Sequence, residues 1–333
     1  MKTADTRPAP INCPDAAGCH LVVELSREGG ALVAMASRPY PLSAIRANAN
    51  RLSWLEGLGF LGARIGPKQR FESPMESMAL GFAAGDLRAT AQTQEALLLL
   101  TSNGLLALNQ AGRSLSTVTP ESSAWALATD GRAAILSTGA AGSSTGAILR
   151  VVLASGSVEV AASGEARPGP VAIDEGGLYW ATFGGGPALD GAGSVRMLAI
   201  GGAPVTLAAG ESAPRSLATS ASHVYWISDA PDGRHLRRVS KRGGPPLEVA
   251  HIPGAQGTRG EERLLVAGDE AFALFGGRLY RAPAAAGPAT PVLELRPPSG
   301  RVVSFDVDHG SIYATVEFPA GVQAKLERAR RRH

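Results

Sequence analysis

Apolar and polar residues alternate over short stretches in most of this chain, and turn-forming residues separate these stretches. Val171–Ile173 and Leu178–Trp180 are two such stretches, with Asp174–Gly177 between them. Alternation with a period of two is typical of half-buried β-strands, and acidic and glycine residues between strands are typical of tight turns. The pattern predicts many short strands and no long helix.

The same strand–turn–strand unit recurs at Ser216–Trp226. The Tyr–Trp pairs that begin at residues 179 and 225 are 46 positions apart, which is the length of a four-stranded propeller blade. Each pair is followed by a loop, an alternating strand, a Gly–Gly turn at Gly201 or Gly243 and a further strand. The repeat therefore predicts four strands per unit.

Weaker copies of the second strand of this unit occur along the rest of the chain, at spacings of roughly 36 to 47 residues. The run Leu97–Leu100 in one of them can also be interpreted as a helix. The predicted fold is all-β, a seven-bladed β-propeller of four-stranded antiparallel blades, with six or eight blades as alternatives. The seven second strands are expected at Leu52–Trp54, Ala96–Leu98, Ala134–Leu136, Leu178–Trp180, Val224–Trp226, Ala271–Ala273 and Ile312–Ala314.

The two ends of the chain both fall within a blade. Glu24–Val33 aligns with Arg238–Leu247, the third and fourth strands of a unit. Near the other end, the first, second and a suggested third strand are Val302–Asp306, Ser311–Val316 and Val322–Arg328. Pairing the two ends would remove open sheet edges, so the last blade is expected to combine N- and C-terminal strands. We expect an N-terminal extension over residues 1–19 and one propeller domain over residues 20–333.

The repeat resembles that of a known family. Val224-Tyr225-Trp226, followed by Arg-Val-Ser-Lys-Arg-Gly-Gly-Pro-Pro-Leu-Glu-Val-Ala at Arg238–Ala250, is similar to the repeat of bacterial propellers abundant in deltaproteobacteria, and more distantly to YWTD-type propellers. The likeness extends from about Val171 to Ala250. The acidic residue that closes the YWTD motif is absent after Trp180, and Ser228-Asp229 replace it after Trp226. The resemblance implies a propeller fold and an exported or lipid-anchored protein, but no activity.

Composition agrees with one repetitive domain. Of 333 residues, 44% are hydrophobic and 18% charged, with 41 glycines and 23 prolines, so the chain can bury a core between many turns. The net charge is only +3, and no aromatic residues interleave with the basic run between Lys325 and Arg332. No stretch is long and apolar enough to span a bilayer. We expect a monomer that binds no nucleic acid.

The two cysteines, Cys13 and Cys19, are either a small disulfide loop or two free thiols. Only His20 is adjacent as a further ligand, so a metal site there is not expected. A bridged pair would fit an extracytoplasmic protein, periplasmic or secreted. The polar segment Met1–Ala9 shows no leader in this chain.

Three arginines precede the first strands of consecutive units and are candidates for a ligand site at the mouth of the propeller channel. They are Arg215, Arg263 and Arg301, lying 10, 9 and 12 residues before Tyr225, Phe272 and Tyr313. Guanidinium groups on neighbouring blades could converge on one anion. The alternative is that they pair with local acids such as Glu261, Glu262 or Asp306.

Histidines and serines do not form a catalytic motif in this sequence. His223 and His309 are expected in turns. His235 begins a third strand and His251 ends a fourth, with no carboxylate cluster at ligand spacing beside either. Gly142–Gly146 matches Gly-x-Ser-x-Gly but lies between two predicted strands, where the motif requires a following helix. The loop Gly184–Pro187 with Asp190 offers too few carboxylates for a cation.

The predicted function is a non-enzymatic propeller that binds a protein or a small anionic ligand. The alternative is a lyase or hydrolase with its active site at the channel mouth. We assign no catalytic residue, no metal and no cofactor. The aromatic residues of the second strands, such as Trp54, Tyr179 and Tyr313, are expected to pack between blades.

Overall fold

The structure is a computed structural model, and it describes fifteen segments of the chain. They are residues 19–27, 33–38, 41–48, 51–57, 59–64, 76–79, 86–109, 114–139, 144–184, 191–230, 232–253, 262–285, 287–293, 300–308 and 310–318. These segments contain 28 β-strands and no α-helix. Consequently no helix of the described chain has the length and apolar character needed to cross a membrane.

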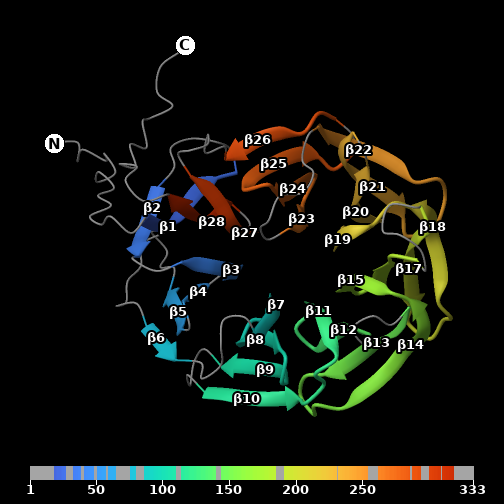
Figure 1. Cartoon of the computed structure of the whole chain (residues 1–333), viewed down its shortest axis with the longest axis horizontal. Helices are drawn as coiled ribbons and strands as arrows, with labels where there is room; N and C mark the ends of the chain where they lie inside the picture. The colour runs from blue at the N-terminus through green and yellow to red at the C-terminus, as the bar shows by residue number, and fades with distance from the viewer. Residues whose placement is uncertain are drawn as a thin grey trace. The chain divides into compact units, whose positions relative to one another are not determined.

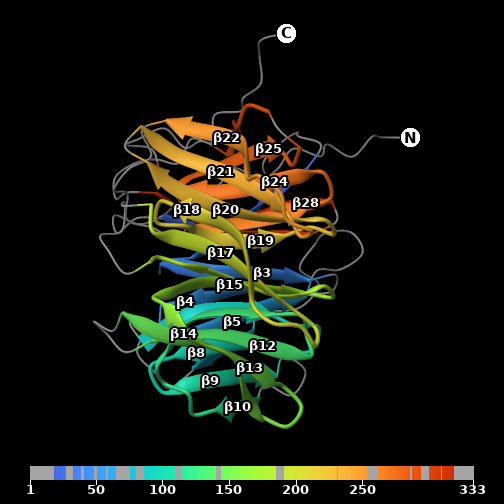
Figure 2. The same ribbon diagram turned by 90° about the vertical axis from the view of Figure 1, so that its right-hand side faces the viewer.

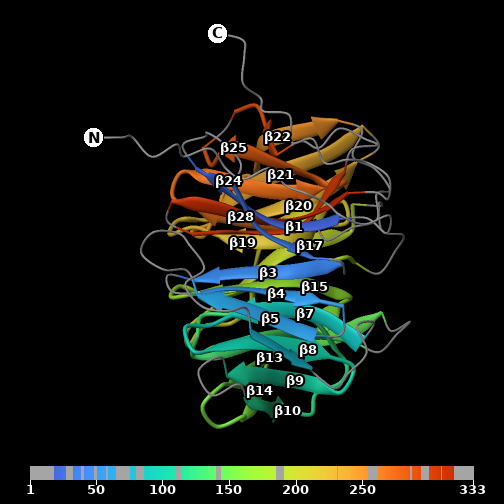
Figure 3. The same cartoon turned by 90° about the vertical axis from the view of Figure 1, so that its left-hand side faces the viewer.

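By its contacts the chain divides into two compact units, Met1–Ala79 with Leu293–His333 (unit 1) and Leu80–Val292 (unit 2). Unit 1 holds two four-stranded antiparallel sheets, and Figure 3 shows β3, β4 and β5 of one of them side by side. This sheet has the order β3 (Leu42–Asn48), β4 (Arg51–Glu56), β5 (Gly59–Arg64) and β6 (Glu76–Ala79). The other has the order β27 (Arg301–Val307), β28 (Ser311–Phe318), β1 (Cys19–Ser26) and β2 (Val33–Arg38).

Strands from the two ends of the chain thus share one sheet. β1 pairs with β28 along its whole length, from Cys19 opposite Phe318 to Ser26 opposite Ser311. The expectation that the N-terminal segment supplies the third and fourth strands is confirmed, and β1 begins one residue before the predicted domain. The suggested third strand at Val322–Arg328 lies outside the described residues, and β1 occupies the third place.

Unit 2 contains five further four-stranded antiparallel sheets. Their strands are β7 (Leu87–Gln92), β8 (Ala96–Thr101), β9 (Gly104–Asn109) and β10 (Ser114–Thr119); β11 (Ala124–Thr129), β12 (Ala133–Thr138), β13 (Thr145–Val152) and β14 (Val158–Ala166); β15 (Pro168–Asp174), β16 (Gly177–Thr182), β17 (Gly193–Ala199) and β18 (Val205–Glu211); β19 (Arg215–Thr219), β20 (His223–Ala230), β21 (Gly233–Ser240) and β22 (Leu247–Pro253); and β23 (Arg263–Ala267), β24 (Glu270–Phe275), β25 (Arg278–Pro283) and β26 (Thr290–Leu293).

The sheets of unit 2 have the arrangement of propeller blades. Figure 1 shows them following one another around an arc, coloured from teal to orange, and consecutive first strands β7, β11, β15, β19 and β23 contact each other. Figure 2 shows β20 and β21 of one blade side by side. The prediction of an all-β propeller arrangement of four-stranded antiparallel sheets is confirmed.

All seven segments predicted as second strands lie in second strands, namely β4, β8, β12, β16, β20, β24 and β28. The run Leu97–Leu100 belongs to strand β8 and is not helical. All four of its leucines are buried. Because both faces of this strand are covered, its sequence is continuously apolar and carries no alternation.

Large aromatic side chains of the second strands fill the space between neighbouring sheets, as predicted. In unit 2, Tyr179 packs with Leu217, Val224 and Trp226 of the next sheet. In unit 1, Trp54 packs with Val22 and Tyr313. Each of these aromatic rings is almost completely buried, and burying a ring of this size is among the largest single contributions to a core.

A hydrogen bond between first strands recurs in the two units. In unit 2, Leu264 N donates to Ser216 Oγ at 2.8 Å, which joins β23 to β19. In unit 1, Ile45 N donates to Ser304 Oγ at 3.0 Å, which joins β3 to β27. All four residues lie three positions before the last residue of their strand. Equivalent positions of neighbouring blades therefore contact each other directly.

Candidate functional site

Guanidinium groups and one indole ring lie at the starts of the first strands of unit 2. Two of these groups belong to predicted site residues, Arg215 and Arg263, which begin β19 and β23. The structure adds three residues at the equivalent place in the other blades. These are Arg88 in β7, Trp125 in β11 and Arg167, which directly precedes β15.

Trp125 forms an exposed aromatic stack at this end of unit 2. Its ring lies 6.0 Å from the ring of Phe183, with 22° between the planes, and the Arg167 guanidinium lies 5.9 Å from the centre of the same phenyl ring. Trp125 is 38% exposed, whereas the other three tryptophans are completely buried. Phe183 and Arg167 are half-buried, so the stack presents mainly its indole ring to solvent.

Arg215 is held by carboxylates of its own and the neighbouring blade. Its Nε lies 2.6 Å from Asp229 Oδ2, and its Nη1 lies 3.9 Å from Glu262 Oε2. The same two carboxylates pair with Arg234, a buried side chain over the ring of Phe275. The sequence offered pairing with local acids such as Glu262 as the alternative to anion binding, and Arg215 does contact Glu262.

Arg215 and Arg263 lie on neighbouring strands, because Leu264 N donates to Ser216 Oγ one residue after each of them. Arg301 begins β27 in unit 1, where it is exposed and pairs with Glu317 at 2.6 Å. Asp306 is buried and accepts the N–H of Ala47 at 2.9 Å. Burial raises the pKa of this carboxyl to about 6. Convergence of all three predicted arginines on one anion stays a prediction.

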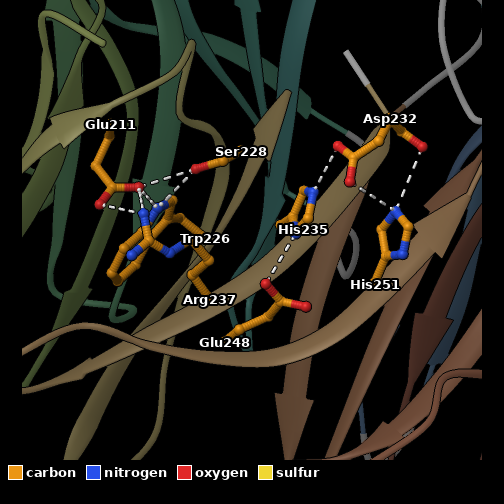
Figure 4. Close-up of polar contacts among 8 residues, drawn as sticks. All are labelled: Glu211, Trp226, Ser228, Asp232, His235, Arg237, Glu248 and His251. Atoms are coloured by element: carbon orange, nitrogen blue, oxygen red, sulfur yellow. Dashed lines mark hydrogen bonds and ion pairs between the residues drawn. The ribbon is translucent and has the colours of Figure 1, made fainter. Parts of the chain in front are cut away.

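The blade of Arg215, β19 to β22, also holds a cluster of two histidines and two carboxylates. The sequence prediction for these histidines was wrong. We expected no carboxylate cluster at ligand spacing beside His235 or His251, but Asp232 groups with both histidines, and Figure 4 shows the two rings with Asp232 and Glu248. His235 Nε2 lies 3.0 Å from Asp232 Oδ1, and His235 Nδ1 lies 2.9 Å from Glu248 Oε2. His251 Nε2 lies 3.7 Å from Asp232 Oδ2.

Strand pairing explains how these residues meet. His235 on β21 is directly opposite His251 on β22, and the rings stack with centres 4.6 Å apart. A β-bulge follows this pair, and the consecutive residues Val249 and Ala250 are both buried. The bulge interrupts the alternation of the strand, so Glu248 lies on the same face as His251. Simple alternation would place Glu248 on the opposite face.

These contacts change the protonation of the cluster. Burial acts to lower the pKa of His235, but its hydrogen bonds to Asp232 and Glu248 outweigh this effect and raise it. The pKa of Asp232 is lowered, chiefly by its hydrogen bond to His235. Two imidazoles and a carboxylate around one point form a donor set of the kind that divalent transition metals use.

The left half of Figure 4 shows a buried network that joins two blades. Glu211 on β18 accepts hydrogen bonds from Trp226 Nε1 at 2.7 Å and from Arg237 at 2.7 and 2.8 Å. Its side chain is 1% exposed. The preceding pair of blades repeats this arrangement with Glu165, Trp180 and Arg196. Because the network recurs between blades, we interpret it as a structural clamp.

The other candidate residues of the sequence either make only local contacts or lie outside the described residues. His223 begins β20 and contacts the hydroxyl of Ser222. Ser144 directly precedes β13, so a strand and not a helix follows the Gly-x-Ser-x-Gly pattern. Cys13, His309 and residues 185–190 lie outside the described residues, as does the side chain of Cys19. The disulfide and the extracytoplasmic location therefore stay predictions.

Solved structures of similar fold are β-propellers. A chain of a nidogen/laminin complex has a TM-score of 0.51 at 11% identity, over 74% of this chain and 99% of the other. The extracellular domain of a one-component system from B. thetaiotaomicron has a TM-score of 0.56 at 11% identity, over 84% and 38% of the two chains. The β-propeller domain of the Trilobed protease from Pyrococcus furiosus has a TM-score of 0.60 at 9% identity, over 84% and 92%.

At these identities the likeness establishes the propeller fold and no activity. The Pyrococcus furiosus domain is described as having an open velcro topology, whereas β1 pairs with β28 in this chain. Neither the protein-family models nor the curated proteins give a match to this chain. The resemblance to the deltaproteobacterial repeat therefore also stays a prediction.

Proposed function

We propose that the seven sheets form a single seven-bladed β-propeller over residues 20–333, closed by the sheet that combines β1 with β28. Two observations support this proposal. The chain ends share a sheet within unit 1, and first strands are joined by the same hydrogen bond in both units. A closed ring leaves no blade without a neighbour, so every inner apolar face is covered.

We further propose that this propeller is a non-enzymatic binding module for a small anionic ligand that carries a flat ring. The observation that carries this proposal is the exposed stack of Trp125 on Phe183, with the Arg167 guanidinium over the same phenyl ring. The indole offers a face for a planar group, and arginine offers forked donors for a carboxylate or phosphate. Arg215 and Arg263 extend the guanidinium groups along the next two first strands.

Tryptophan fluorescence tests this proposal, because Trp125 is the exposed one of the four tryptophans. Benzoate combines a ring with a carboxylate, whereas benzyl alcohol lacks the charge and acetate lacks the ring. We expect benzoate to quench the fluorescence saturably, and more strongly than either of the other probes. Substituting Arg167→Gln should weaken the benzoate response about tenfold, the effect of losing one charge-assisted hydrogen bond.

A matched control is Arg242→Gln, which removes an exposed arginine from the turn between β21 and β22. This control should leave the benzoate titration unchanged. Equal responses to benzoate and benzyl alcohol, together with no effect of Arg167→Gln, would rule out an anion site at the stack.

A further inference from the structure

Asp232, His235 and His251 bring three metal-ligating side chains to one point of a single blade. Asp232 precedes β21, His235 lies near the start of β21, and His251 lies near the end of β22. One donor atom from each residue can be chosen so that all three lie within 4.8 Å of one another. Because consecutive residues of a strand point to opposite faces, His235 lies on the face opposite to Arg234 and its ion pairs.

The spacing of the donor atoms suits a small divalent ion. In a tetrahedral site with bonds of about 2.0–2.2 Å, neighbouring ligand atoms lie about 3.3 Å apart. His235 Nε2 lies 3.0 Å from Asp232 Oδ1 and His251 Nε2 lies 3.7 Å from the other oxygen, Oδ2, so the same carboxylate contacts both imidazoles. With one donor atom from each residue, the three atoms lie within 4.8 Å of one another, and binding an ion would draw them closer together.

Glu248 supplies the outer partner that metal-bound histidines usually have. Its Oε2 lies 2.9 Å from His235 Nδ1, so the carboxylate accepts the ring N–H at that position. This contact orients the ring and directs Nε2 toward Asp232. Metal-binding imidazoles are typically fixed in this way by a carboxylate on the nitrogen that does not bind the ion.

The pairing of the strands holds the two rings in place before any ion binds. His235 and His251 are register partners, and their stacked rings are tilted by only 20°. The side chain of His235 is 19% exposed and that of Asp232 is 63% exposed. The cluster therefore combines a fixed inner ligand with an outer ligand that solvent can reach, which an entering ion requires.

We propose that Asp232, His235 and His251 bind one divalent transition-metal ion of the zinc type, with a fourth position open to water or an external ligand. Two imidazole nitrogens favour zinc, cobalt and nickel ions over magnesium and calcium, which prefer oxygen ligands. Three protein ligands with an open position are typical of zinc sites that exchange an outer ligand, whereas purely structural zinc sites are closed by four.

Calorimetric titration with zinc tests this site in tag-free, chelator-treated protein. Cys13→Ser and Cys19→Ser are introduced first, because thiolates beside His20 could bind zinc independently. We expect one zinc ion per chain, displaced by neither magnesium nor calcium. His251→Ala and Asp232→Asn should each weaken zinc binding about 100-fold or more, and Glu248→Gln about tenfold, as expected for an outer partner.

His223→Ala is the matched control, because His223 lies in the same blade but outside the cluster. It should leave the zinc affinity unchanged. Asp232 is exposed, so Asp232→Asn tests the site without disturbing the core, and equal urea midpoints verify that the variants are folded. Zinc binding that survives both Asp232→Asn and His251→Ala, or that falls equally in His223→Ala, would overturn the proposal.

Discussion

Deleting residues 1–38 is expected to leave a chain that does not fold stably. The deletion removes β1 from the middle of its sheet and leaves β28 with an unpaired edge. Leu21, Val22 and Val23 of β1 are completely buried. At about 1.5–3 kcal/mol for each buried aliphatic side chain, their loss removes roughly 5–9 kcal/mol, which is comparable to the total stability of a typical domain.

Circular dichroism and size-exclusion chromatography of the truncated chain would check this expectation. The matched control is deletion of residues 1–18, which retains β1 and should leave the unfolding midpoint almost unchanged. Adding a peptide of residues 19–38 during refolding should restore part of the folded protein. A truncated chain that remains soluble and unfolds at the same midpoint as the full chain would contradict the role given to β1.

Replacing Glu211 with alanine should destabilise the protein by about 3 kcal/mol. The substitution leaves Trp226 Nε1 and the Arg237 guanidinium without their carboxylate partner. Breaking a buried ion pair by removing one partner costs about 3–5 kcal/mol, and the lower value applies because the Arg237 side chain is 29% exposed. Urea denaturation followed by circular dichroism measures the loss.

Glu159→Ala is the matched control for this substitution. Glu159 also pairs with an arginine, Arg150, at 3.3 Å, but both side chains are exposed. Surface ion pairs of this kind contribute less than about 1 kcal/mol. If Glu211→Ala lowers the free energy of unfolding by no more than Glu159→Ala does, the buried carboxylate between the blades does not stabilise the fold.

Much of the fold could be predicted from the sequence because its repeat is carried by local patterns. The Tyr–Trp pairs recur 46 residues apart and the Gly–Gly turns 42 residues apart, and they mark the second strand of a blade and the turn between its third and fourth strands. The faint copies, such as the one at Leu97–Leu100, became recognisable once this spacing was known. The third strand of the last sheet was harder to predict, because Val322–Arg328 and the N-terminal segment both have strand-like patterns. Only the pairing of β1 with β28 in the folded chain assigns this place to the N-terminal segment.

The candidate sites were less predictable because they depend on register. His235 and His251 are distant in the sequence, and the contact of His235 with Glu248 depends on a bulge that breaks the alternation. Trp125 and Arg167 lie 10 and 12 residues before Ile135 and Tyr179, the same offsets that Arg215 and Arg301 have from their second strands. They were missed because their interest comes from the stacking of Trp125 on Phe183, which only the folded chain brings about.

Cysteine cross-linking tests most directly whether the sheets close into one ring. In a chain carrying Cys13→Ser and Cys19→Ser, the pair Ser216→Cys with Leu264→Cys is a positive control, because these residues contact each other between β19 and β23. Ser304 occupies the equivalent place in β27, so a closed ring would bring it beside Leu264.

If the ring is closed, Leu264→Cys with Ser304→Cys should form a disulfide as readily as the control pair, as measured by mass spectrometry of digested protein. A disulfide needs Cα atoms within about 7 Å of each other. Cross-linking of the control pair without any cross-linking of the second pair would contradict a single closed propeller.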